Sequence, residues 1–135
     1  YRCLVDAHSL APGQHGINLA EFVAREHILV SSGGFIGITD EGLAAQGLSR
    51  QVCASTSHFA ALPFLLKGSQ AVATIPGHAA EAIAGLTGLC VLPCPLALPR
   101  YPVELGWRTQ AQLDPLLLKV REAISASFTW PPSAC

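Results

Sequence analysis

The sequence predicts an α/β layer fold with mostly parallel strands. Short runs of apolar and β-branched residues alternate with segments of helical spacing, and glycine or proline stands between them. This alternation is typical of parallel strands joined by crossover helices. Apolar residues make up 50% of the 135 residues and charged residues 13%. This composition supports a packed core and excludes a disordered chain.

The first elements are expected close to the N-terminus. Arg2–Val5 is a strand of apolar residues, and glycines and a proline mark residues 7–16 as a loop. Asn18 has the side chain of an N-cap, and Glu21 follows three residues later, which is close to a capping box. A short helix over 19–25 is therefore predicted.

The middle of the chain repeats the strand–helix pattern. A helix is predicted to begin at Thr39 and to end at Gln46, with Gly47 at its C-cap. Ser57 is predicted to cap the helix over 59–67, and Pro76 opens a helix of about ten residues that ends near Gly85 or Gly88. The strands expected between these helices are 28–30, Gln51–Thr56, 71–75 and 89–92.

The last third of the chain begins with a proline-rich extended segment over 93–102. A strand is predicted over 103–107. Asp114 and Pro115 form an N-cap followed by proline at the first helical position, which is a strong helix start. The helix that follows has an apolar stripe at helical spacing, formed by Leu116, Leu117, Val120 and Ile124.

The order of these elements predicts two lobes. Residues 7–92 contain four strand–helix units and are expected to pack their own core. Residues 1–6 and 93–128 are expected to belong to a second, incomplete lobe, joined by connectors near Asp6 and at 93–102, with 129–135 as a tail. A chain that leaves a lobe and returns to it is common where a ligand sits between lobes. Tyr1 is the first residue and there is no methionine, so we expect a fragment of a longer protein.

Charge and cysteine content exclude several functions. The eight Lys and Arg residues are scattered singly, and the formal net charge is −1, so direct nucleic-acid binding by these residues is not expected. No apolar run has the length of a membrane helix, and no signal peptide opens the chain. The five cysteines include no Cys-x-x-Cys pair, which favours reduced thiols in a cytoplasmic protein. No metal site or cofactor is predicted.

Four ordered pieces of the chain resemble one known family. The pieces are YRCLVDAHSLA, INLAEFVAREHILVSSGG, DEGLAAQGLSRQVCASTSHFAALPFLLKGSQAVATIP and GLCVLPCPLALPRYPVELGWRTQAQLDPLLLKVREAI. Together they resemble the effector-binding domain of LysR-type transcriptional regulators, from late in its first subdomain to its end. The resemblance implies a type 2 periplasmic-binding-protein-like fold with one complete subdomain plus part of a second. It also implies a small-molecule effector, and DNA binding only through an N-terminal domain outside these residues.

The loop after the second predicted strand is the first candidate binding site. It contains two hydroxyls and two glycines, and glycine lets backbone N–H groups approach a ligand. The family resemblance places effector contacts on this loop, where the hydroxyls would bind a carboxylate or phenolate. An ordinary strand-to-helix turn is the alternative. The loop residues are Ser31, Ser32, Gly33, Gly34 and Phe35.

Two further strand ends are candidates, because open α/β sheets bind ligands at the carboxyl ends of their strands. His58 would hydrogen-bond an effector and Phe59 would stack on it, unless the two residues only cap a helix and fill the core. Pro76 lies at the third strand end. His78, close by, is expected to be a solvated first-turn residue.

The resemblance predicts a cytoplasmic sensor, not an enzyme, for a small organic inducer, with aromatic compounds as one candidate class. It also predicts a homo-oligomer, paired through the helix from Thr39 to Gln46 and a strand from Gln51 to Ser55. A lobe of a periplasmic-type solute-binding protein is one alternative. The other is a small α/β enzyme with a Cys or Ser nucleophile, for example Cys53 with His58. Burial of Cys53 would discriminate against that enzyme.

The incomplete lobe has a further consequence. The apolar faces of 103–107 and of the last helix would lack their natural partners. Exposed apolar patches of this kind associate. We therefore expect dimerisation or close packing of these elements against the other lobe.

Overall fold

The computed structural model describes residues 1–34, 36–109 and 114–127. The chain forms two compact units, Tyr1–Arg100 and Tyr101–Cys135. Among the described residues, no helix combines the length and the apolar character needed to cross a membrane. The site residues predicted above all lie in the first unit, apart from Phe35, which lies outside the described residues.

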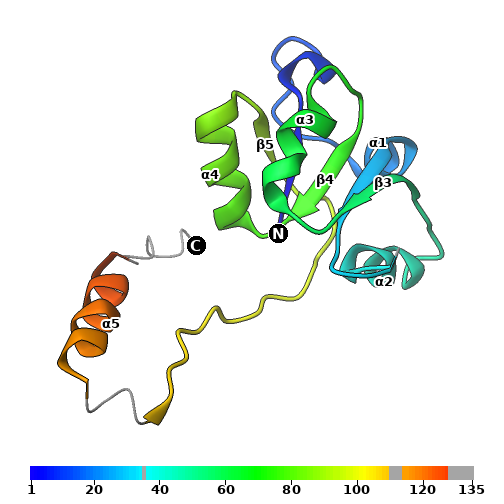
Figure 1. Ribbon diagram of the computed structural model, residues 1–135. Helices are drawn as coiled ribbons and strands as arrows, with labels where there is room; N and C mark the ends of the chain where they lie inside the picture. Colours follow the sequence, from blue (N-terminus) through cyan, green and yellow to red (C-terminus); the bar gives the residue numbers. More distant parts are fainter. Residues whose placement is uncertain (35, 110–113, 128–135) are drawn as a thin grey trace. The chain divides into compact units, whose positions relative to one another are not determined.

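The first unit is built on a five-stranded sheet of order β3-β2-β4-β1-β5 (Figure 1). Its strands are β1 (Arg2–Val5), β2 (Glu26–Val30), β3 (Gln51–Thr56), β4 (Val72–Ile75) and β5 (Cys90–Pro93). β2 pairs in parallel with both β3 and β4, whereas β1 is antiparallel to β4 and β5. Four strands therefore share one direction and β1 alone reverses it, which confirms a mostly parallel sheet.

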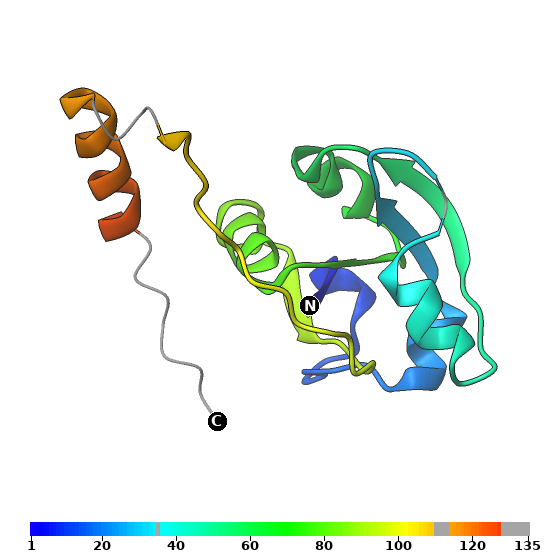
Figure 2. The same cartoon turned by 90° about the horizontal axis from the view of Figure 1, so that it is seen from below.

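Short helices connect these strands. They are η1 (Ala7–Ser9), α1 (Leu19–Ala24), α2 (Ile38–Ala44), η2 (Phe59–Ala61), α3 (Leu62–Leu66) and α4 (Gly77–Thr87). Figure 2 shows α2 and α3 on opposite sides of the sheet. Each side has its own apolar cluster, so the unit has three layers.

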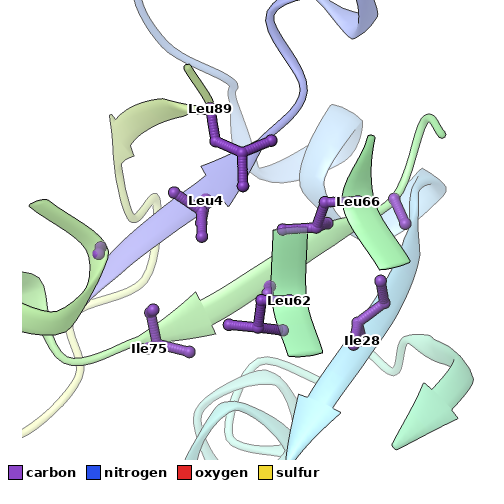
Figure 3. Packing of buried hydrophobic residues seen from close by; sticks show 9 residues of the cluster. Leu4, Ile28, Leu62, Leu66, Ile75 and Leu89 are labelled. Atoms are coloured by element: carbon purple, nitrogen blue, oxygen red, sulfur yellow. The ribbon is translucent and has the colours of Figure 1, made fainter. Parts of the chain in front are cut away.

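The first cluster joins α3 and α4 to one face of the sheet. Leu62 and Leu66 of α3 are fully buried against Leu4 of β1 and Ile28 of β2 (Figure 3). The second cluster lies on the other face. There Phe22 of α1 and Leu43 of α2 pack with residues of β1, β4 and β5 and with Leu96 of the following segment. Burying side chains of this size contributes about 1.5–3 kcal/mol each.

Local signals set most of the helix boundaries as expected. The Glu21 N–H donates to Asn18 Oδ1 and the Asn18 N–H donates to Glu21 Oε2, both at 2.9 Å, which completes the capping box of α1. Beyond α2, Gly47 has φ +68° and accommodates the left-handed turn that ends the helix. The prediction that Ser57 caps a helix was wrong: His58 is the residue before η2, and the Ser57 hydroxyl bonds to its imidazole.

The second unit contains α5 (Pro115–Ser127), and its expected cap is present. Asp114 Oδ1 accepts hydrogen bonds from the N–H groups of Leu116 at 2.8 Å and Leu117 at 3.4 Å. The strand predicted over 103–107 is not formed. A strand needs the backbone of a neighbour to satisfy its N–H and C=O groups, and no described strand of this unit supplies one.

The apolar stripe of α5 remains largely uncovered. Leu116 is 67% exposed and Val103 is 65% exposed. A shallow hollow in this unit is lined by Leu105, Trp107, Leu117, Leu118, Val120, Arg121 and Ile124. Within it the Arg121 guanidinium lies 4.9 Å from the centroid of the Trp107 ring. The expectation that these faces associate stays a prediction, because the structure contains a single chain.

Candidate functional site

Three strand ends meet at one edge of the sheet. β2 lies between β3 and β4 and runs parallel to both, so the carboxyl ends of the three strands lie side by side. Ser31 follows β2, Ser57 follows β3 and Pro76 follows β4. The sheet therefore brings the three predicted contact regions to the same edge, where open α/β sheets bind ligands.

The loop after β2 is tied to the end of β3. The Ser31 N–H donates to the Thr56 carbonyl at 2.9 Å. Inside the loop, the Gly33 N–H donates to Ser31 Oγ at 3.2 Å. Ser32, Gly33 and Gly34 are exposed, so their polar groups face solvent. Gly34 has φ +113°, a conformation that disfavours any side chain at this point.

The segment after β3 adds a hydroxyl, an imidazole and a phenyl ring. Ser57 Oγ lies 2.8 Å from His58 Nδ1. The Thr56 hydroxyl oxygen accepts the His58 N–H at 3.2 Å, which holds the backbone at the strand end. His58 is exposed and Phe59 is 40% exposed. Phe59 is therefore not a core aromatic, and its ring is available for stacking.

The end of β4 adds a backbone turn and, unexpectedly, a cation. Half-buried Pro76 accepts the N–H groups of Ala79 and Ala80 at the start of α4. Arg2 is paired with Ile75 across the antiparallel β1–β4 ladder, and a Cβ placed on Gly77 would lie 3.5 Å from Arg2 Cγ. The exposed guanidinium of Arg2 thus stands at the same edge. Sequence reasoning missed it because strand order decides which residue lies beside this turn.

A buried ion pair joins the first turn of α2 to the residue before β3. Arg50, at the approach to β3, donates from Nε to Asp40 Oδ1 at 2.9 Å and from Nη2 to Oδ2 at 2.7 Å. The Arg50 side chain is 2% exposed and the Asp40 side chain 25%. Asp40 also accepts the Gly37 N–H at 2.7 Å. The hydrogen bonds from Arg50 hold the pKa of Asp40 below its usual value.

His27 lies beside this pair and is fully buried. Burial lowers its pKa to about 4, so the imidazole is neutral near pH 7. Its Nε2 donates to the Phe22 carbonyl at 2.8 Å, which leaves Nδ1 as an acceptor 3.4 Å from Arg50 Nη1. His27 thus joins β2 and α1 to the Arg50 side chain and has no exposed surface for a ligand.

Hydrogen bonds hold the first predicted connector in place at Asp6. Its carboxylate accepts the N–H groups of Gly68 and His8. These two hydrogen bonds lower the pKa of Asp6 to about 2, and the bond from Gly68 has the larger effect. Nearby, Arg25 donates to the Ser9 carbonyl at 2.8 Å and to the Gln70 carbonyl at 3.0 Å.

The Cys53–His58 pair of the enzyme alternative is not assembled. Cys53 is exposed on β3, an edge strand of the sheet, so the burial that would have discriminated against this enzyme is not found. Its thiol donates to the His27 carbonyl at 3.5 Å, whereas the His58 imidazole bonds to Ser57. Among residues 1–34, 36–109 and 114–127, no three His, Cys, Asp or Glu side chains are grouped as metal ligands would be.

The model of the LysR substrate-binding domain family matches residues 2–129. The chain belongs to this family. Its fold is therefore the type 2 periplasmic-binding-protein fold, as the resemblance implied. Membership of the family confirms the resemblance to the LysR effector-binding, or substrate-binding, domain.

The chain is similar to curated proteins that include a transcriptional activator and a nodulation protein. The chain is 25% identical over 114 residues to the HTH-type transcriptional activator NahR of Pseudomonas putida, covering 84% of this chain and 38% of NahR. It is 24% identical over 110 residues to nodulation protein D 2 of Rhizobium leguminosarum bv. phaseoli, covering 80% of this chain and 35% of that protein. The chain thus spans less than half the length of these relatives.

Solved structures of transcriptional regulators share this fold. The regulatory domain of MexT, a transcriptional activator in Pseudomonas aeruginosa, superposes with a TM-score of 0.78 at 32% identity. The match covers 93% of this chain and 61% of the MexT chain. A transcriptional regulator from Vibrio parahaemolyticus shares the fold at 17% identity, with a TM-score of 0.72 over 93% of this chain and 58% of that one.

Proposed function

We propose that this chain is part of the effector-binding domain of a cytoplasmic LysR-type regulator, and that its effector is a small aromatic acid. The observation that carries the proposal is the convergence of three strand ends at one edge of the sheet. The complete subdomain would be the compact unit Tyr1–Arg100 rather than residues 7–92 alone, because β1 lies inside its sheet and Leu96 in its core. The residues after Arg100 would belong to the other subdomain.

The groups at this edge match the two ends of an aromatic acid. The exposed Phe59 ring and the His58 imidazole offer stacking partners for an aromatic ring. Arg2, the hydroxyls of Ser31 and Ser32 and the N–H groups of Ser32 and Gly34 offer donors for a carboxylate. The Gly33 N–H would contribute less, because it already donates to Ser31 Oγ inside the loop.

A panel of three small probes tests this proposal. Benzoate carries both features, cyclohexanecarboxylate lacks the aromatic ring and benzyl alcohol lacks the charge. Thermal unfolding of the chain is measured with each probe at equal concentration. A ligand at a hundred times its Kd stabilises a protein by about 2.7 kcal/mol. We expect benzoate to raise the Tm more than either of the other two probes.

Matched variants locate the binding groups. Arg2→Gln and His58→Ala should each reduce the benzoate shift. Lys67→Gln removes the same charge as Arg2→Gln but lies just after α3, away from the carboxyl ends of the strands, so it should leave the shift unchanged. Equal shifts for the three probes, or equal losses in the two charge variants, would contradict an aromatic-acid site at this edge.

Effector binding would act on gene expression through a dimer and a DNA-binding domain N-terminal to these residues. β3 is an edge strand, and its Gln51, Cys53 and Ser55 are exposed. A free strand edge is a template for pairing with a second chain, and α2 would complete the interface. Sedimentation velocity should show a dimer that Cys53→Lys weakens, because two like charges would then meet at the interface. A dimer insensitive to this change would place the interface elsewhere.

A further inference from the structure

Two cysteines, one near each end of the first unit's sequence, belong to the same apolar cluster. Cys3 of β1 is paired with Thr74 of β4 on one side and with Leu92 of β5 on the other. Cys94 comes two residues after Leu92 and so returns to the same face of the sheet. Both cysteines belong to the cluster on that face. Each thiol also has the largest influence on the pKa of the other, as expected for two side chains that share this face.

The two thiols differ in the way that a reactive pair requires. Cys3 is 0% exposed, and its Sγ also lies 3.9 Å from Thr74 Oγ1. Cys94 is partly exposed, so a small reagent can reach it. The neighbouring Cys3 thiol lowers the pKa of Cys94 to about 7, whereas burial acts in the opposite direction and the Leu96 N–H assists the lowering. The same contact and burial raise the pKa of Cys3.

We propose that Cys94 and Cys3 form a thiol pair that low-molecular-weight disulfides oxidise to an intramolecular disulfide. Cys94 would be the attacking residue and Cys3 the resolving one. A reactive thiol that is accessible and stands beside a resolving cysteine is the arrangement found in redox-sensitive sites. The buried position of Cys3 protects it from direct attack, so the order of the two steps is fixed.

The reaction balances with oxidised glutathione as the oxidant. The Cys94 thiolate attacks one glutathione sulfur, and the glutathione disulfide breaks to release one glutathione thiolate. Cys3 then attacks Cys94 Sγ in the mixed disulfide, and a second glutathione thiolate leaves. The proton of the Cys3 thiol passes to a released thiolate. Two protein thiols are oxidised, and one glutathione disulfide is reduced to two thiols.

The bond would join β1 to the segment that follows β5. If the proposed function is correct, these are the two connections to the other subdomain, and oxidation would restrict any movement between them. This consequence rests on the proposed function, whereas the thiol pair does not. The experiment below therefore uses no effector, and its failure is distinguishable from a failure of effector binding.

Peptide mapping of the oxidised chain tests the pair. Cys53 and Cys135 are replaced by serine to suppress bonds between chains. The chain is treated with oxidised glutathione, free thiols are alkylated, and trypsin is added. After cleavage by trypsin, Cys3 lies in peptide 3–25, and Cys90 and Cys94 lie together in peptide 68–100. We expect these two peptides to become crosslinked, with loss of the mass of two hydrogens.

Two single variants identify the partner of Cys3. Cys90 is the matched control, because it is partly buried in the same cluster but stands on the far side of Leu92 from Cys94. The crosslink should persist in Cys90→Ser and disappear in Cys94→Ser. A crosslink that instead depends on Cys90 would overturn the proposal. So would a map in which Cys94 carries glutathione while Cys3 is still alkylated as a free thiol.

Discussion

The Asp40–Arg50 ion pair gives the sharpest test of how the first unit is held together. The substitution Asp40→Asn keeps the shape of the side chain and removes its charge. The two hydrogen bonds from Arg50 are short, at 2.9 and 2.7 Å, and the Arg50 side chain is 2% exposed. The substitution therefore leaves a buried guanidinium without its counter-ion.

The expected cost follows from this burial. Removing one partner of a fully buried ion pair costs about 3–5 kcal/mol. Because the Asp40 side chain is 25% exposed, water can partly replace the lost carboxylate, and the expected loss of unfolding free energy is about 2–3 kcal/mol. The double variant Asp40→Asn/Arg50→Met removes the stranded charge as well. It should be more stable than the sum of the two single losses predicts.

Urea unfolding followed by far-UV circular dichroism measures these free energies. Tryptophan fluorescence is unsuitable, because both tryptophans lie in residues 101–135 and report on the second unit. Glu41→Gln is the matched control: it removes an exposed carboxylate from the same turn of α2 and should cost under about 1 kcal/mol. Equal losses for Asp40→Asn and Glu41→Gln, or strict additivity in the double variant, would refute the reasoning.

Three further predictions concern single residues of the first unit. The folded state lowers the pKa of His27 from 6.5 to about 4, so its stabilising contribution is complete above pH 6.5 and is lost as the pH falls towards 4. Unfolding free energy should drop by about 3 kcal/mol over that interval, and a His27→Gln variant that shows the same drop would contradict this. Asn18→Ala removes the capping box and should cost about 1 kcal/mol in urea unfolding; an unchanged midpoint would show that the cap contributes nothing. Gly88 has φ +73°, so Gly88→Ala should lower the unfolding free energy by about 1–2 kcal/mol. Thermal unfolding should show this as a lower Tm, and a Tm equal to that of the parent would argue against the left-handed turn.

The candidate site was partly predictable, because its regions follow strand ends that the sequence marks. Ser32, Gly33, Gly34, His58 and Phe59 all lie where the βα pattern placed them, and they are exposed. Whether they contact an effector stays a prediction. Arg2 was not predictable, because it reaches this edge only through antiparallel pairing of β1 with β4. No local sequence pattern indicates that β1 runs antiparallel to β4.

The sequence by itself determined the features that depend on a few neighbouring residues. Side chains that bond to backbone groups three residues away or nearer form the capping box of Asn18 and Glu21 and start α5 at Asp114. A glycine that tolerates positive φ forms the turn at Gly47. The tertiary structure decided the rest. Residues 103–107 form no strand because a strand requires a neighbour, Cys53 is exposed because β3 is an edge strand, and Cys3 shares an apolar cluster with Cys94 because β1 pairs with β5. These contacts link residues far apart in the chain, so strand order, which local propensity does not encode, fixes them.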